Sequence, residues 1–121
     1  MGPVRQVGAA DLHEAAGTEG IQRWSAFSEE GFWAGVAQGE PDFDSGWHHH
    51  TDNHTIVYVI EGRMRIEWGQ HPEMSVEGAA GDFLHVPPHT IHREINPHRE
   101  PVKAAVIRVG RGEPVVNVDA P

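Results

Sequence analysis

The sequence contains no cysteine. Disulfides and thiolate metal sites are therefore excluded, and any metal ion must be held by nitrogen and oxygen ligands. Positive charge is also scarce, because 9 Lys and Arg residues stand against 18 Asp and Glu residues, for a formal net charge of −9. This balance argues against non-specific binding to nucleic acids or anionic membranes, since both depend on basic side chains that meet phosphates.

Long apolar runs are missing as well. The first residues, 1–6, lack the apolar core of a signal peptide, and no stretch is long and apolar enough to cross a bilayer. We therefore expect a cytoplasmic protein without a nucleic-acid or membrane partner. Aromatic residues make up only 7% of the chain, too few for a base-stacking platform. A chain of 121 residues predicts one domain with a buried core.

Short segments of alternating apolar and polar residues run through the chain, and glycine- or proline-rich turns separate them about every eight to twelve residues. No amphipathic pattern is long enough for a helix. We therefore expect an all-β protein, a small barrel of the jelly-roll type. The expected strands are residues 21–27, 32–37, 63–69, 74–77, 83–86 and 102–109, with a turn at 70–73 and an apolar tail at 114–118 that could add an edge strand in this subunit or in another.

Residues 1–20 differ from the rest because they are mostly small and polar. Between Ala9 and Ala16 they could form at most one or two helical turns. We expect residues 1–20 to be an N-terminal arm and residues 21–121 to form the barrel.

Four histidines, one of them His54, lie within seven residues and lead into an apolar, β-branched run that ends at Gly62. Such a run is typical of a strand. Because side chains alternate between the two faces of a strand, His48 and His50 point the same way and His49 points the other way. Neutral imidazole is the commonest protein ligand for divalent transition metals, so His48 and His50 predict half of a coordination sphere.

A second cluster, at residues 81–96, combines a short apolar strand, a Pro-Pro turn and a new strand. His92, Glu94 and Asn96 share one face of that new strand, and His92 could complete the metal site. An inward carboxylate near a metal is costly to bury unless it is paired or takes part in a reaction, so Glu94 is a candidate catalytic base. The alternative is that the strand has already reached solvent at Glu94.

The two stretches resemble the paired motifs of the cupin superfamily, G(X)5HXH(X)3-4E(X)6G at residues 46–62 and G(X)5PXG(X)2H(X)3N at residues 81–96. The combination of two motifs is more specific than either motif alone. It implies a small single-domain cupin, a double-stranded β-helix. The matching positions are His48, His50 and Gly62 in the first motif and Gly81, Pro87, His92 and Asn96 in the second, where only His89 departs from the usual glycine.

The glutamate of the first motif has no direct counterpart. Counting back from Gly62 places Thr55 in its position, whereas counting forward from His50 reaches His54. Some cupins use a histidine at this position, and a one-residue bulge would reconcile the two counts. By resemblance, His54 joins His48, His50 and His92 as a metal ligand, but whether His54 or Thr55 fills the position stays open.

The resemblance implies one divalent transition metal ion, with iron, manganese, nickel, copper and zinc all compatible. It also implies a metal-dependent enzyme that acts on a small organic metabolite, with dioxygenase-type oxidation as the leading reaction. Lewis-acid isomerisation or cyclisation of a carbonyl substrate is the first alternative. A non-catalytic metabolite-binding cupin with a structural metal is the second, because a fold does not fix a function.

We also expect a homodimer. Ile56, Tyr58 and Ile60 alternate with the inward residues Val57 and Val59, and a monomer would leave this outer apolar face in water. Two-fold packing, sheet to sheet or through exchanged edge strands, would cover it. In similar proteins the N-terminal arm often lies across the partner subunit.

Overall fold

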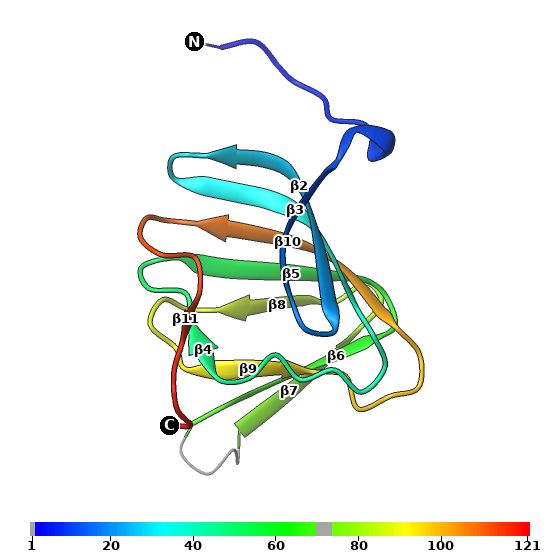
Figure 1. Ribbon diagram of the computed structural model, residues 1–121, viewed down its shortest axis with the longest axis vertical. Helices are drawn as coiled ribbons and strands as arrows, with labels where there is room; N and C mark the ends of the chain where they lie inside the picture. Colours follow the sequence, from blue (N-terminus) through cyan, green and yellow to red (C-terminus); the bar gives the residue numbers. More distant parts are fainter. Residues whose placement is uncertain (1, 70–73) are drawn as a thin grey trace.

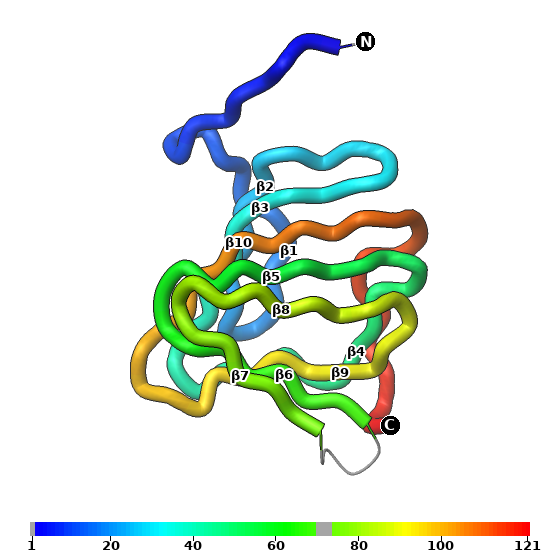
Figure 2. Tube along the Cα trace, turned by 180° about the vertical axis from the view of Figure 1, so that it is seen from behind, coloured from blue at the N-terminus to red at the C-terminus, as the bar shows by residue number. Residues whose placement is uncertain are grey.

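The computed structural model describes residues 2–69 and 74–121, so the turn expected at 70–73 lies outside the described residues. Two antiparallel sheets face each other, and the first residues extend away from both of them (Figure 1, Figure 2). The expected all-β architecture of the jelly-roll type is confirmed, although the two sheets form a sandwich and do not close into a barrel. The described residues contain no helix that is long and apolar enough to span a bilayer.

The larger sheet has the order β1-β2-β3-β10-β5-β8, and the smaller sheet has the order β11-β4-β9-β6-β7. The strands of the larger sheet are β1 (His13–Thr18), β2 (Ile21–Glu29), β3 (Phe32–Gly39), β10 (Val102–Val109), β5 (His54–Glu61) and β8 (Phe83–Val86). Those of the smaller sheet are β11 (Val116–Asn117), β4 (His48–His49), β9 (His92–Ile95), β6 (Arg63–Trp68) and β7 (Met74–Ala79).

The core lies between the two sheets and follows the alternation that the sequence predicts. On β5, Val57 and Val59 are buried while Tyr58 and Ile60 are exposed. Apolar side chains from both sheets meet these valines, and their removal from water drives the two layers together. The buried apolar residues are Ile21, Ala37, Phe43, Val57, Val59, Met64, Ile66, Leu84, Val86, Val102, Ala104 and Val106.

The N-terminal segment contains one helical turn, which is within the limit of one or two turns that the sequence allows, and it also contains a strand that was not expected. A single 3-10 turn, η1 (Ala9–Asp11), is followed by the strand β1, which pairs antiparallel with β2. Pairing with β2 satisfies backbone groups of residues 13–18 that a short isolated helix would leave to water. Residues 13–18 therefore belong to the larger sheet of this subunit.

The histidine stretch also departs from the single strand that its pattern predicts. The strand β4 ends at His49, and the chain turns at Thr51, which has a φ of 52°, before β5 begins at His54. Asn53 closes this turn, because its backbone N–H and its side-chain amide both donate to the carbonyl of His50, at 3.0 Å each. As a result, β4 and β5 lie in different sheets.

The outer face of the larger sheet carries a continuous apolar patch. Val109 lies opposite Phe32, and Tyr58 lies opposite Phe83 with ring centroids 4.7 Å apart. We propose that a second copy of the chain covers this outer patch, since soluble monomers rarely expose large contiguous apolar areas. The outer patch consists of Phe32, Tyr58, Ile60, Phe83, Ile107 and Val109, all exposed by between 38% and 71%.

We expect the native chain to be a dimer at micromolar concentration by light scattering. Ile107→Glu should shift it to monomer, because a carboxylate at the centre of an apolar interface would have to be desolvated. Val76→Glu is the matched control, since Val76 is 42% exposed and Ile107 is 41% exposed, but Val76 lies on β7 of the other sheet. A native chain that scatters only as a monomer would contradict the dimer.

Candidate metal centre

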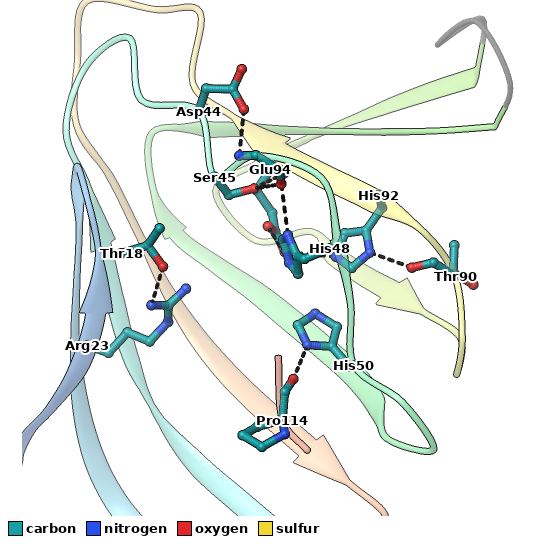
Figure 3. A network of polar contacts seen from close by, with 11 residues as sticks. Thr18, Arg23, Asp44, Ser45, His48, His50, Thr90, His92, Glu94 and Pro114 are labelled. Carbon is teal, nitrogen blue, oxygen red and sulfur yellow. Dashed lines mark hydrogen bonds and ion pairs between the residues drawn. The ribbon is translucent and has the colours of Figure 1, made fainter. Parts of the chain in front are cut away.

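Three histidines and one glutamate meet at one point of the sandwich interior. The ligand atoms of His48, His50, His92 and Glu94 all lie within 4.8 Å of one another. His48 on β4 is the cross-strand neighbour of His92 on β9, and His50 follows directly after β4. Figure 3 shows the three rings and the carboxylate turned toward one another. Two segments that are far apart in the sequence therefore supply the site.

Each of the three rings is oriented by a backbone carbonyl. The Nδ1 atoms of His48, His50 and His92 lie 2.9, 2.5 and 2.8 Å from carbonyl oxygens. A carbonyl can only accept, so each Nδ1 must carry the proton, and each neutral ring keeps a free lone pair on Nε2. This is the arrangement by which proteins orient histidine ligands toward a metal. The three acceptors are the carbonyls of Gly46, Pro114 and Thr90.

The loop before β4 is tied to β9, which fixes the relative position of the two motifs. The backbone N–H of Ser45 donates to the carbonyl of Glu94 at 2.9 Å, and the N–H of Glu94 donates to the Ser45 hydroxyl at 2.9 Å. Asp44 accepts from the N–H of Gly46 at 2.8 Å. Gly46 in turn supplies the carbonyl that orients His48.

The lone pairs at the centre of the site need a positive charge between them. The Nε2 atoms of His48 and His92 each lie 3.2 Å from an oxygen of Glu94, and the buried Nε2 of His50 has no partner among the described residues. Neutral Nε2 atoms and carboxylate oxygens are all acceptors, so these contacts are favourable only with a proton or a cation in place. The donor set therefore fits a metal ion.

The pKa shifts at the site follow from the same contacts. Burial opposes charge on His48, but its contacts with Glu94 and the Gly46 carbonyl outweigh burial and raise its pKa. Burial also opposes charge on Glu94, yet its contacts with His48 and His92, whose Nε2 atoms can carry a proton toward it, hold its pKa well below the usual value. Burial dominates at His50 and lowers its pKa to about 4. Glu94 is thus an anion and His50 is neutral near pH 7, as metal ligands must be.

His54, the expected fourth histidine ligand, lies outside this group. His54 is exposed at the start of β5, with its Nδ1 3.0 Å from Nε2 of His85. The alternation of β5 turns Thr55 inward, where its hydroxyl is buried without a partner among the described residues. In place of the expected four nitrogens, the structure brings together three nitrogens and one carboxylate, because the turn at Thr51 separates His54 from β4 and Glu94 reaches the site from β9.

Two residues near the motifs have the local roles that their patterns suggest. His49 points away from the metal centre, and its Nδ1 accepts from the N–H of Thr51 at 3.1 Å. Asn96 is fully buried, and its amide donates to the carbonyls of Glu40 and Glu100 at 3.3 and 2.8 Å. Asn96 therefore ties loops together and does not reach the cluster.

Sequence reasoning missed two arginines, Arg23 and Arg108. Both occupy inward positions of core strands: Arg23 lies opposite Ala37, and Arg108 lies between Trp33 and Thr55. Burial lowers the pKa of Arg108 to about 10, and the charge of Arg23 adds to this effect. The signal was present, because an arginine that continues the buried series of Val102, Ala104 and Val106 must also point inward.

A small hollow adjoins the metal centre, and a larger cavity shares two residues with that hollow. The small hollow, of about 40 Å³, is lined by His50, Thr55, Glu94 and apolar core residues. The larger cavity, of about 640 Å³, lies between β1, the start of β3 and the C-terminal segment. Arg23 and Arg108 line both hollows, so they lie at the boundary between the metal centre and the larger cavity.

The C-terminal segment closes the site within the same subunit. Its strand β11 pairs with β4, which confirms the expected edge strand. The carbonyl of Glu113 accepts from the Thr51 hydroxyl at 2.6 Å, and the carbonyl of Pro114 accepts from His50. Pro114 and Val115 also line the larger cavity.

A comparison of the sequence with models of protein families agrees with the observed fold, and the matching region includes the metal centre. The sequence model of the cupin domain matches residues 35–108, more than half of the chain. The protein belongs to the cupin family. No curated protein matches the chain.

Solved structures similar to this cupin include KdgF from Halomonas sp., with a TM-score of 0.72 and 17% identity over 90% of this chain and 96% of that chain. A sugar phosphate isomerase of the cupin superfamily from Silicibacter pomeroyi has a TM-score of 0.72 and 15% identity, over 88% and 76% of the two chains. An oxalate decarboxylase variant from Bacillus subtilis has a TM-score of 0.70 and 22% identity, over 85% and 29%. At these identities the similarity concerns the fold alone.

Replacing His92 with alanine should lower the metal affinity of this cupin by at least about tenfold, because one of three histidine ligands is lost. Metal content of the purified protein, measured by mass spectrometry, checks this, and circular dichroism reports whether the strands survive. His54→Ala is the matched control, since His54 is exposed and lies outside the group. Full occupancy in His92→Ala, or an equal loss in His54→Ala, would contradict the assigned ligand set.

Proposed function

We propose that this cupin is a metal-dependent enzyme that acts on a small organic metabolite by dioxygenase-type oxidation. The observation that carries the proposal is the convergence of three imidazoles and one carboxylate at a hollow inside the sandwich. Four protein ligands leave coordination positions of a six-coordinate ion free, and an open position is what distinguishes a catalytic site from a closed structural one. We further propose a cytoplasmic location.

A bound ion of iron, manganese, nickel or copper would supply redox chemistry as well as Lewis acidity, and zinc would supply Lewis acidity alone. His48, His50 and His92 would present their Nε2 lone pairs, each held in place by a carbonyl on the other side of the ring. Glu94 would contribute the negative charge that the first motif lacks at its glutamate position.

The small hollow favours oxidation as the reaction. Its volume of about 40 Å³ suits a diatomic molecule or a water molecule, and it is too small for an organic metabolite. Most of its lining is apolar, including Ile21, Phe43 and Val57, so it suits dioxygen better than water. The organic substrate would then occupy the larger cavity, on the other side of Arg23 and Arg108.

The position of Glu94 supports a second candidate function, the isomerisation or cyclisation of a carbonyl substrate. A carboxylate next to a Lewis-acidic ion can take a proton from the carbon beside the carbonyl. The fold similarity to a sugar phosphate isomerase is compatible with this reaction. A metabolite-binding cupin with a structural metal remains the non-catalytic alternative.

Oxygen uptake separates these functions. We expect the metal-loaded protein to consume oxygen with at least one member of a panel of enols, diketones and catechols, and the chelated protein to consume none. His92→Ala serves as a second negative control. Proton exchange into deuterated water without oxygen uptake would favour the isomerase, and binding without either reaction would favour the binding protein.

Glu94→Gln tests the role of the carboxylate. The variant keeps the shape of the side chain but loses the charge between the Nε2 atoms of His48 and His92, so we expect at least about tenfold weaker metal binding. If Glu94 is also the catalytic base, turnover at saturating metal should fall by roughly a hundredfold or more. An unchanged rate at full metal occupancy would exclude Glu94 as the base.

A further inference from the structure

We propose that Arg23 and Arg108 form a carboxylate-binding site in the larger cavity, which selects an organic acid as the ligand of the neighbouring metal centre. This inference rests on the proposed function, because it takes the metal centre beside the arginines to be a reactive site. It adds the class of substrate, which neither the metal centre nor the cupin fold specifies.

The two guanidinium groups have no acidic partner within ion-pair distance among the described residues. Other arginines, such as the exposed Arg5 and the half-buried Arg93, pair with carboxylates at 2.6 and 2.7 Å. In contrast, Arg23 makes one hydrogen bond, to the neutral hydroxyl of Thr18 at 3.0 Å. The buried Nε of Arg108 has no partner among the residues that the structure describes. A cation buried without a partner is costly, so its retention here points to an anionic ligand.

The nearby carboxylates do not neutralise Arg23 and Arg108, because each of them already contacts another side chain. Glu94 attracts both arginines from a distance, but its two oxygens already face His48 and His92. Glu29 also lines the larger cavity, and its carboxylate is 2.6 Å from Arg5. The two guanidinium groups also repel each other, which helps to lower the pKa of Arg108. A bound anion would relieve this repulsion.

Neighbouring side chains hold both guanidinium groups in defined orientations. The guanidinium carbon of Arg108 lies 5.1 Å from the centroid of the Trp33 ring, within the range of a cation–π contact. Thr18 on β1 fixes the end of Arg23, as Figure 3 shows. A guanidinium group can bind a planar carboxylate through two parallel N–H groups. Two guanidinium groups with fixed orientations therefore suit a carboxylate ligand.

The rest of the cavity favours an organic acid over a phosphate. Its volume of about 640 Å³ is within the range of small-molecule sites, and a large part of its lining is apolar. Phosphate sites commonly use backbone N–H groups at helix N-termini, whereas the cavity lining comes from strands and connecting segments. The apolar part of the lining consists of Ala15, Ala16, Phe32, Trp33, Pro114 and Val115.

Calorimetry with a panel of probes tests the proposal. The probes are benzoate and succinate, their neutral amides benzamide and succinamide, and inorganic phosphate, each titrated into the metal-loaded full-length protein. We expect at least one carboxylate to bind, and its amide to bind at least about tenfold more weakly, because hydrogen bonds between charged groups are stronger than neutral ones.

Arg108→Gln and Arg23→Gln should each weaken carboxylate binding by about ten- to a hundredfold. Arg23 is only half-buried, so its variant keeps the test valid if the Arg108 variant does not fold. Arg63→Gln is the matched control, because Arg63 is exposed on β6 and does not line either hollow. It should leave binding unchanged.

Several outcomes would overturn the proposal. These are the absence of carboxylate binding, equal binding of acids and amides, tighter binding of phosphate, or unchanged binding in both arginine variants. Carboxylate binding that chelation abolishes and the arginine variants leave intact would place the carboxylate on the metal. Because binding is measured without turnover, arginine-dependent binding in a protein that consumes no oxygen would refute the dioxygenase and leave this site standing.

Discussion

The site depends on one repeated interaction, the hydrogen bond from a histidine Nδ1–H to a backbone carbonyl. It occurs at His48, His50 and His92, and in each case it leaves the Nε2 lone pair directed at the shared centre. The carbonyl acceptors belong to the loop before β4, the turn before β9 and the C-terminal segment. Three separate segments must therefore be in place before the rings converge, so the metal centre forms only with the complete sandwich.

The electrostatics of the interior follow from that convergence. One carboxylate lies among three imidazoles, and two guanidinium groups lie on the side of the larger cavity. Each group would be costly to bury alone. A metal ion would offset the cost at the histidines and Glu94, and the proposed carboxylate ligand would offset it at the two arginines. The protein thus concentrates its few buried charges in one region. The remaining interior is the apolar core that supports the two sheets.

Much of the fold could be predicted because alternation is a local property. The pattern of Val57 and Val59 against Tyr58 and Ile60 predicts the buried and exposed faces of β5, and the structure confirms it. The alternation of the histidines does not reveal the turn at Thr51, although the next two residues, Asp52 and Asn53, are of types that are common in turns and rare in strands. Pairing with β2 likewise converted residues 13–18 into a strand, although their local preference is weak.

Residue patterns alone predicted the all-β class and the shared direction of His48 and His50, because spacing along a strand decides which side chains share a face. The resemblance to the cupin motifs predicted that His92 joins them. Packing between strands placed Glu94, and not His54, beside the three histidines, and it placed Arg108 next to Glu94 along the small hollow. The physical reason is that these contacts join different strands and both sheets. Sequence spacing fixes directions within one strand, but packing between strands fixes which atoms meet.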